Sequence, residues 1–337
     1  MYRAVILLVF VIGIKPQFAQ QSLDKYKDYE FMPGENILFE DNIGSSTTSN
    51  WEVLGGDVIQ ETSETEPAIR INKYYTVLSP RMEKAPTGAE FFTIEFDAYL
   101  DSKYEGNPGV FINFLSGDEP TATLGTLAKY TQFDFGSSKN RIENPLQINN
   151  SAYYDKWHHY VFTYSPQYQG SVIIYVDQFK VIDLKECLLN FERITVNGNS
   201  SDEMIMKFRN FRITDSGPAN LQQSLMSSGK FVSHGILFNP DNTLKPESMG
   251  TLRQISRALN ESPDLKLEIE IYSDNAGNNA EINNTRRAEI VKAALVQMGI
   301  NENRLIAPGK GDGFPVGNNL TNTEKANNRR VEFKTFK

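Results

Sequence analysis

The chain has 337 residues, of which 39% are hydrophobic and 23% are charged, and its net charge is −8. This length predicts about two domains, and the composition is that of globular protein. The acidic balance excludes a general nucleic-acid-binding protein, which needs a basic face. With one cysteine and three histidines, the chain has no basis for a disulfide framework, and we expect neither a metal site nor a cofactor.

The first 20 residues have the layout of a secretory signal peptide. Arg3 supplies a positive charge, residues 4–14 form an uncharged apolar run, and a polar stretch containing the small residue Ala19 follows. The run is shorter than the roughly 20 residues of a membrane span, and an uncleaved anchor is the alternative. No cysteine follows the run, so we do not expect a lipoprotein anchor. We predict an exported protein with a signal peptide at residues 1–20 and a polar linker at residues 21–35.

Residues 36–215 have the pattern of an all-β domain. Short runs alternate apolar with polar residues and are separated by Gly, Asn, Asp, Ser and Pro. A tight hairpin is predicted around Asp177 and Gln178. Many short strands without a helical repeat predict a β-sandwich or jelly roll. The clearest strands are residues 91–100, 109–114, 158–164 and 204–213.

One part of this region resembles a known type of β-sandwich. Trp157 and His158 begin a strand, Gly170 marks a turn, and residues 172–177 form the next strand, as in concanavalin A/laminin-G domains. Residues 208–213 fit the closing strand of such domains. The resemblance implies a fold often used for carbohydrate binding, although fold alone does not establish function. We therefore expect a glycan or an envelope protein as the partner of this domain.

The sequence pattern changes after residue 215. Residues 216–231 are predicted to be a linker, and residues 232–337 alternate strands with helices. Apolar residues at helical spacing predict helices at 246–259 and 286–298. Strands are predicted at residues 235–238, 265–271 and 330–336. The chain is therefore predicted to be multidomain, with an N-terminal all-β jelly-roll sandwich and a C-terminal α/β sandwich.

The last hundred or so residues resemble the OmpA C-terminal domain family. The stretches that carry the resemblance are Lys245-Pro246-Glu247-Ser248, Arg287-Ala288-Glu289-Ile290-Val291, Gly309-Lys310-Gly311, Pro315, Asn319, Thr321 and Ala326-Asn327-Asn328-Arg329-Arg330-Val331-Glu332-Phe333. The resemblance implies a non-catalytic protein that binds peptidoglycan. It also implies a place in the periplasm, in association with the cell wall and the outer membrane.

The same resemblance implies a binding site for the diaminopimelate group of the peptidoglycan stem peptide. It places the two main ligand-binding residues at Asp274 and Arg287, with Asn275, Arg286 and Arg329 as further candidates. Diaminopimelate carries an ammonium and a carboxylate on one carbon, which a carboxylate and a guanidinium can hold respectively. The alternatives are a turn residue for Asp274, a surface charge for Arg287 and a structural ion pair for Arg329.

The segment between Asp274 and Arg287 departs from the family pattern. It is about two residues shorter than usual, and Asn283 and Asn284 replace the usual Leu-Ser pair. Arg286 therefore competes with Arg287 for the ligand-binding role. The departure puts the shape and the affinity of the predicted pocket in doubt.

Two acids in the first domain raise an alternative function. Glu95 and Asp97 lie two residues apart on one predicted strand, and hence on one face, as in sandwich-fold glycanases. Retaining hydrolysis uses two carboxylates about 5 Å apart, but the third acid usual in such a strand is absent, since Ala98 follows. We predict a protein that is not an enzyme, and the alternative is a wall-tethered glycan hydrolase.

Overall fold

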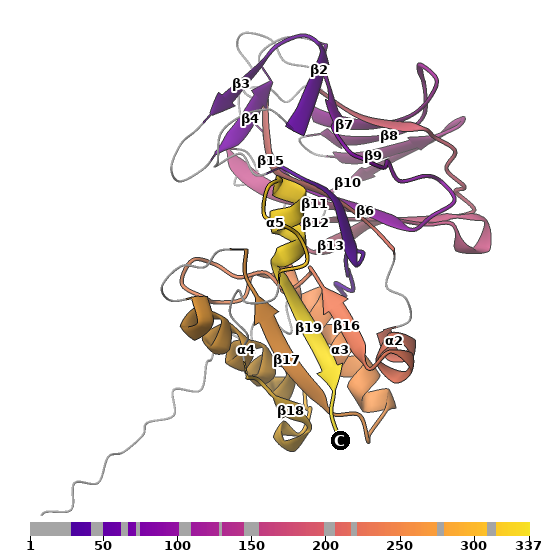
Figure 1. Cartoon of the computed structure of the whole chain (residues 1–337). Helices are drawn as coiled ribbons and strands as arrows, with labels where there is room; N and C mark the ends of the chain where they lie inside the picture. Colours follow the sequence, from indigo (N-terminus) through magenta and orange to yellow (C-terminus); the bar gives the residue numbers. More distant parts are fainter. Residues whose placement is uncertain are drawn as a thin grey trace, which may run out of the picture.

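The computed structural model describes residues 28–41, 50–61, 67–71, 75–100, 109–127, 130–144, 155–198, 206–216, 221–274, 280–308 and 315–337. The predicted signal peptide at residues 1–20 lies outside them. Within the described ranges, no helix combines the length and apolarity needed to cross a membrane. Figure 1 shows two units, a β-rich one above and a mixed one below, which we call the sandwich unit and the C-terminal unit.

The sandwich unit consists of two antiparallel sheets. Its strands are β1 (Asn36–Glu40), β2 (Trp51–Gly55), β3 (Val58–Glu61), β4 (Ala68–Ile71), β5 (Thr76–Pro80), β6 (Phe92–Leu100), β7 (Gly109–Ser116), β8 (Glu119–Leu127), β9 (Tyr130–Phe135), β10 (Ser138–Glu143), β11 (Lys156–Ser165), β12 (Ser171–Val176), β13 (Phe179–Lys185), β14 (Arg193–Gly198) and β15 (Met206–Asp215). One sheet has the order β13-β12-β11-β6-β15-β4-β3, with β1 paired to β15, and the other has the order β10-β9-β8-β7-β14-β5-β2. The predicted all-β sandwich is confirmed.

The alternation of side chains along β6 and β11 builds the core and places the acids outside it. Phe96 of β6 lies opposite Tyr160 of β11, and both are fully buried between the sheets. Because successive side chains point to opposite faces, Glu95 and Asp97 lie on the outer face of this sheet. The predicted hairpin is also confirmed: Asp177 and its successor have positive φ angles of 47° and 69°, as the two central residues of a type I′ turn require.

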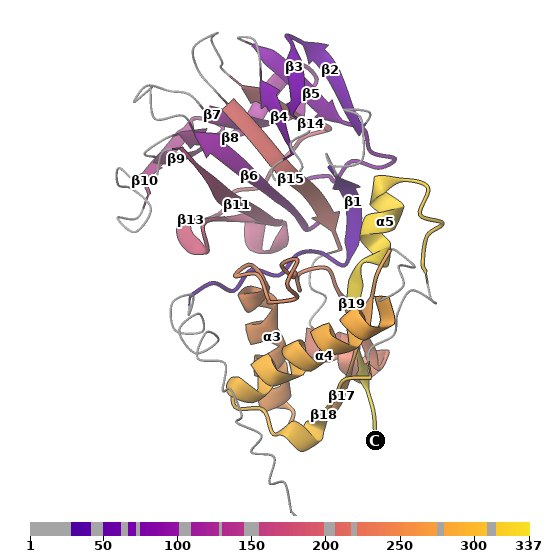
Figure 2. The ribbon, with the colours of Figure 1, turned by 90° about the vertical axis from the view of Figure 1, so that its left-hand side faces the viewer.

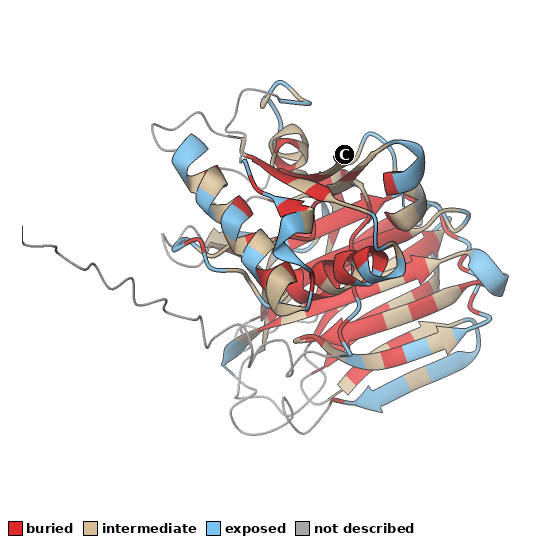
Figure 3. Ribbon diagram, turned by 90° about the horizontal axis from the view of Figure 1, so that it is seen from below, coloured by how far each residue is buried: buried red, intermediate tan, exposed pale blue. Residues whose placement is uncertain are grey.

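The C-terminal unit is a four-stranded sheet packed against helices. Its elements are α2 (Leu221–Ser227), β16 (Lys230–Ser233), α3 (Ser248–Glu261), β17 (Leu267–Tyr272), α4 (Ala280–Gln297), β18 (Leu305–Ile306), α5 (Asn322–Asn328) and β19 (Arg330–Thr335). The sheet order is β16-β19-β17-β18, in which only β17 and β18 are parallel. Leu267, Ile269 and Ile271 of β17 belong to one buried cluster with residues of α3 and α4. Most residues of α3 are buried, whereas the buried residues of α4 recur among intermediate and exposed ones; Figure 3 colours the chain by burial. The predicted α/β sandwich is confirmed.

The first described residues lie between the two units. Tyr29 is fully buried, and its ring meets Tyr175 of β12 with centroids 5.0 Å apart. Phe31 and Met32 are buried in the same cluster as the core of the C-terminal unit. Residues 28–34, which we call the interdomain strap, run across the interface into β1 (Figure 2). Part of the predicted linker is therefore buried in a core. The linker is polar in overall composition, but it contains the apolar side chains Tyr29, Phe31 and Met32, which pack into the core.

Candidate functional site

Asp274 lies two residues beyond the end of β17. Figure 1 shows that this end of β17 faces the sandwich unit. The Asp274 carboxylate accepts a hydrogen bond from Nη1 of Arg329, the residue that ends α5. Its backbone carbonyl accepts a second bond from Nδ2 of Asn319, at 3.0 Å. The Asp274 side chain remains 22% exposed, so solvent still reaches it.

Arg329 joins Asp274 to the sandwich unit. Its Nη2 donates to Oε1 of Glu40, the last residue of β1, while Nη1 donates to Asp274. We call these three residues the Glu40–Arg329–Asp274 bridge. The prediction placed Arg329 near the site, and the structure brings it against Asp274. Glu40 was not predicted, because nothing in its local sequence distinguishes it from any other acid at the end of a strand.

The neighbours of Arg329 fix its position. Asn327 accepts a hydrogen bond from the N–H of Ile37 and donates one to the carbonyl of Ile37, both at 3.2 Å. Asn328 is fully buried and accepts bonds from the N–H groups of Val316 and Gly317, at 2.7 and 3.0 Å. Helix α5 is therefore attached to β1 on one side and to its own preceding loop on the other.

Arg287 lies in the first half of α4 and has different partners. Its Nε donates to Oδ1 of Asn242 at 2.8 Å, and its guanidinium lies over the ring of Phe238, 5.1 Å from the centroid. Burial lowers its pKa from the ordinary arginine value. Its two Nη groups donate to none of the residues that the structure describes. Asp274 and Arg287 form no ion pair with each other.

The remaining candidate residues differ in their exposure and in their contacts. Asn275 lies outside the described residues. Arg286 is exposed on α4 and interacts electrostatically with Asp241. Asn284, one of the two residues that replace the usual pair, donates to the hydroxyl of Ser273 at 3.2 Å. This bond ties α4 to the residue before Asp274, so the altered segment still holds the helix beside the site.

Glu95 and Asp97 are occupied by cationic partners. Oε1 of Glu95 accepts bonds from Nε and Nη2 of Arg212, at 3.1 and 2.7 Å, and Asp97 accepts one from Nδ1 of His159 at 2.9 Å. Burial opposes ionisation of both acids, but Arg212 and His159 lower the pKa of Glu95, and His159 lowers that of Asp97. A glycosidase general acid needs a raised pKa. The arrangement is that of a structural charge cluster.

This buried cluster continues into the C-terminal unit. Nη1 of Arg212 donates to the carbonyl of His234 at 3.1 Å, and Nδ1 of His234 donates to the carbonyl of Arg329 at 3.1 Å. Burial lowers the pKa of His234 to about 4, so the ring is neutral near pH 7. One histidine therefore connects the buried cluster of the sandwich unit to the bridge at Asp274.

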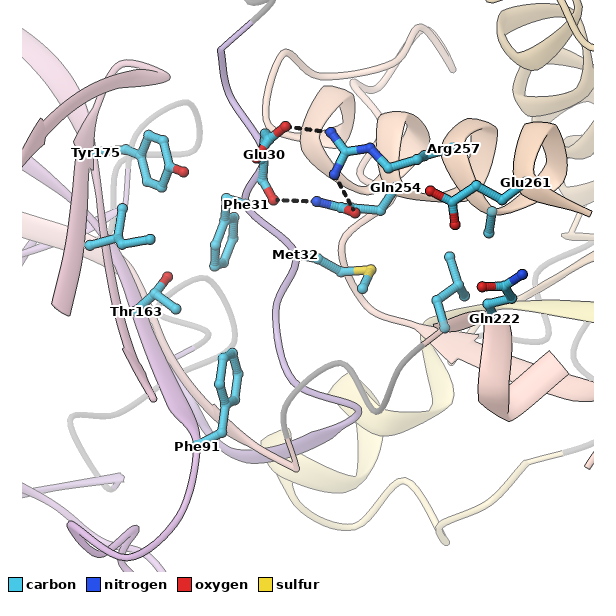
Figure 4. A pocket seen from close by; sticks show the side chains of 13 residues that line it. Glu30, Phe31, Met32, Phe91, Thr163, Tyr175, Gln222, Gln254, Arg257 and Glu261 are labelled. Carbon is cyan, nitrogen blue, oxygen red and sulfur yellow. Dashed lines mark hydrogen bonds and ion pairs between the residues drawn. The ribbon is translucent and has the colours of Figure 1, made fainter. Parts of the chain in front are cut away.

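A second contact between the units surrounds a cavity of about 380 Å³. Figure 4 shows the interdomain strap between the sandwich strands and α3, and Phe31 and Met32 of the strap are among the residues that line the cavity. Glu30 of the strap pairs with Arg257 of α3 and accepts a bond from Gln254 through its carbonyl, at 3.3 Å. None of these residues belongs to the Glu40–Arg329–Asp274 bridge, so the described residues form two separate ion-pair contacts between the units.

The fold and this edge of the sheet define a two-unit protein with an OmpA-type C-terminal domain. Residues 237–329 match the OmpA family and form an OmpA family domain. The chain is 31% identical over 129 residues to "Probable lipoprotein YiaD" of Escherichia coli (strain K12), covering 34% of this chain and 58% of the relative. It is 36% identical over 107 residues to "Outer membrane protein A" of Bordetella avium, covering 29% and 55%.

A third relative has a more specific name. "Peptidoglycan-binding protein ArfA" of Mycobacterium tuberculosis (strain ATCC 25618 / H37Rv) is 33% identical over 122 residues, covering 35% of this chain and 36% of the relative. The chain thus spans about three fifths of these curated relatives' length or less.

Among solved structures, the receptor binding domain of botulinum neurotoxin C/D mosaic serotype is 13% identical, with 53% of this chain and 48% of that chain covered and a TM-score of 0.42. This likeness is too weak to support an argument, and the sandwich architecture is taken from the strand pairing itself.

Proposed function

We propose that the chain is a non-catalytic cell-envelope protein whose C-terminal domain binds the stem peptide of peptidoglycan. The observation that carries this proposal is the pair of groups beside the loop after β17, within an OmpA family domain. Asp274 presents a partly exposed carboxylate. The Arg287 guanidinium is held through Nε and over the Phe238 ring, and its two Nη groups donate to none of the described residues. The name of one relative, a peptidoglycan-binding protein, supports the same ligand.

The chemistry of the pair suits a zwitterionic ligand. Asp274 would accept hydrogen bonds from the ammonium group of diaminopimelate, and the two Nη groups of Arg287 would donate in parallel to its carboxylate. Partial burial matters, because fully exposed ion pairs contribute little free energy. Asn275 and Arg286 are proposed as further contacts from the loop and from α4.

The wider setting of the proposal follows from the chain organisation. A signal peptide at residues 1–20 would export the protein to the periplasm, where it would associate with the cell wall and the outer membrane. We propose the domain boundaries 36–215 and 232–337, with a glycan or an envelope protein as the partner of the first domain. A hydrolase that uses Glu95 and Asp97 has no supporting observation, since both acids are held in ion pairs.

The test is binding of the full-length secreted chain to peptidoglycan. We would measure pelleting with purified sacculi and calorimetric titration with a soluble disaccharide tripeptide that contains diaminopimelate. Loss of one charge-assisted hydrogen bond costs about 1.5–3 kcal/mol, so Asp274→Asn should weaken binding roughly tenfold or more. Asp264→Asn, an exposed acid in the turn before β17, is the matched control.

The guanidinium is tested separately. Arg287→Lys keeps the charge but removes the two parallel donors, so it should weaken binding, and Arg287→Gln should weaken it further. Binding of the wild-type strength in both Asp274→Asn and Arg287→Gln would overturn the proposed site.

A further inference from the structure

We propose that Glu40, a residue of the sandwich unit, is a positioning residue of the peptidoglycan site. By holding Arg329, Glu40 sets the charge that Asp274 presents to the ammonium group of the ligand. The inference rests on the proposed function, because it concerns the same site.

The argument begins with the charges of the bridge. One guanidinium, Arg329, hydrogen-bonds to the two carboxylates of Glu40 and Asp274. One positive and two negative charges leave a net charge of −1. The side chains of Glu40, Arg329 and Asp274 are 19%, 34% and 22% exposed, so water screens them only in part. An ammonium group arriving at Asp274 therefore meets a bridge whose three side chains carry a net negative charge.

Without Glu40, the net charge of the remaining bridge residues changes from −1 to zero. Arg329 and Asp274 alone form a neutral pair, and the guanidinium has one acid partner instead of two. The ammonium group of a ligand would then compete with Arg329 for Asp274 without any net attraction. Glu40 thus offsets the charge of Arg329 and leaves Asp274 available.

The fold holds Glu40 in this position. Strand β1 pairs with β15, and Phe39 fills the sandwich core with 1% of its surface exposed. The side chain of the next residue, Glu40, lies on the other face of the strand. Arg212 is its partner in the strand register and interacts with it electrostatically, but Arg212 donates its hydrogen bonds to Glu95 and to the His234 carbonyl.

The attachment of α5 to β1 keeps Arg329 within reach. Asn327 makes two hydrogen bonds to the backbone of Ile37, three residues before Glu40. Figure 2 shows α5 lying alongside β1. The sandwich unit therefore contributes the charge of Glu40 to a site in the C-terminal unit. The bonds between Ile37 and Asn327 also keep Glu40 within hydrogen-bonding distance of Arg329.

The experiment compares two ligands on the full-length chain. One is the soluble diaminopimelate-containing disaccharide tripeptide, and the other is the same molecule with the free amine of its diaminopimelate acetylated. Calorimetry gives both affinities, and their ratio measures the preference for the charged amine. Glu40→Gln should weaken binding of the free amine by roughly three- to tenfold and leave the acetylated ligand unchanged, so the ratio falls by the same factor.

Two further variants distinguish a positioning role of Glu40 from a general loosening of the contact between the two units. Glu30→Gln breaks the other interdomain ion pair, with Arg257, and should leave both affinities unchanged. Arg329→Gln leaves Glu40 and Asp274 without a shared cation, so the preference for the free amine should rise. If the preference for the free amine falls in Glu40→Gln and rises in Arg329→Gln, the proposal is supported. A loosened interface would not change this preference in opposite directions in the two variants.

Three results would count against it. If Glu40→Gln keeps the wild-type preference while Asp274→Asn loses binding, this inference is wrong and the proposed function stands. If Asp274→Asn binds both ligands as the wild type does, this inference is wrong, and the proposed site is overturned as well if Arg287→Gln also binds with wild-type strength. If Glu30→Gln and Glu40→Gln lose affinity equally, Glu40 acts only by holding the two units together.

Discussion

Two acid–arginine pairs in this molecule consist of the same chemical groups in different surroundings. In the sandwich unit, the side chains of Glu95 and Arg212 are only 3% and 9% exposed. In the C-terminal unit, those of Asp274 and Arg329 are 22% and 34% exposed. A buried charge cannot exchange its partner without a large desolvation penalty, whereas a partly exposed one can. Residue type does not distinguish a structural ion pair from a binding site, but burial does.

The largest expected effect tests the buried member of this comparison. Arg212→Met removes two hydrogen bonds to the buried Glu95 carboxylate and leaves the His159 ring, 3.7 Å away, as its cationic partner. The variant should lower the free energy of unfolding by about 3–5 kcal/mol. Urea unfolding of the full chain would measure it. Replacing both partners, as Glu95→Leu with Arg212→Met, should recover most of the loss. A loss below about 1 kcal/mol in the single variant would show that water or His159 replaces Arg212 as the partner of Glu95.

The next effect concerns His234, which lies between the two pairs. Its pKa is about 4 in the folded chain and about 6.5 when unfolded, so the unfolded state binds the extra proton. The contribution of neutral His234 to the free energy of unfolding is complete above pH 6.5. As the pH falls toward 4, the free energy of unfolding drops by about 3 kcal/mol.

Denaturant unfolding at pH 7 and pH 4 would measure this loss. His234→Asn can keep the bond to the Arg329 carbonyl but does not titrate, so its stability should fall less across the same interval. Equal losses in the two chains would assign the pH dependence to other groups.

A smaller effect is expected at the start of α5, the helix that leads to Arg329. Thr321 and Glu324 form a capping box, in which the N–H of Glu324 donates to the Thr321 hydroxyl at 3.1 Å. Thr321→Ala should lower the free energy of unfolding by about 1 kcal/mol. Thr323→Ala, inside the same helix, is the matched control and should cost nothing, because alanine favours helix. Equal losses would mean that the cap contributes nothing.

The smallest effect is on the stability of the exposed pair. Asp274→Asn should change the free energy of unfolding by at most about 1 kcal/mol, since partly exposed ion pairs contribute little. Thermal unfolding beside the Arg212→Met chain would give the contrast directly. A loss comparable to that of Arg212→Met would place Asp274 among the structural acids and remove the basis for its role in binding.

The sequence indicated the elements that depend on local patterns. Alternation predicted the sandwich, the Asp177-Gln178 pair predicted a tight hairpin, and motif spacing identified the OmpA family domain. The interdomain strap was not predicted, since Tyr29 and its apolar neighbours show no periodicity.

The contacts of the candidate site were harder to predict. Glu40 contacts a residue 289 positions away, and Arg287 bonds to Asn242, 45 positions away. The first contact depends on how the two units pack, and the second depends on how α4 packs against the segment before α3. Neither packing has a signal in one segment alone.

The packing of the interdomain strap and β1 also fixes the length of the segment between them. Met32 belongs to one core and Phe39 to the other, so the number of residues between them is set by two packing sites at once. A single inserted residue would reverse the facing of β1, turning Phe39 outward and Glu40 toward the core. Length variation should therefore be rare in this segment, even though its composition resembles a tolerant linker.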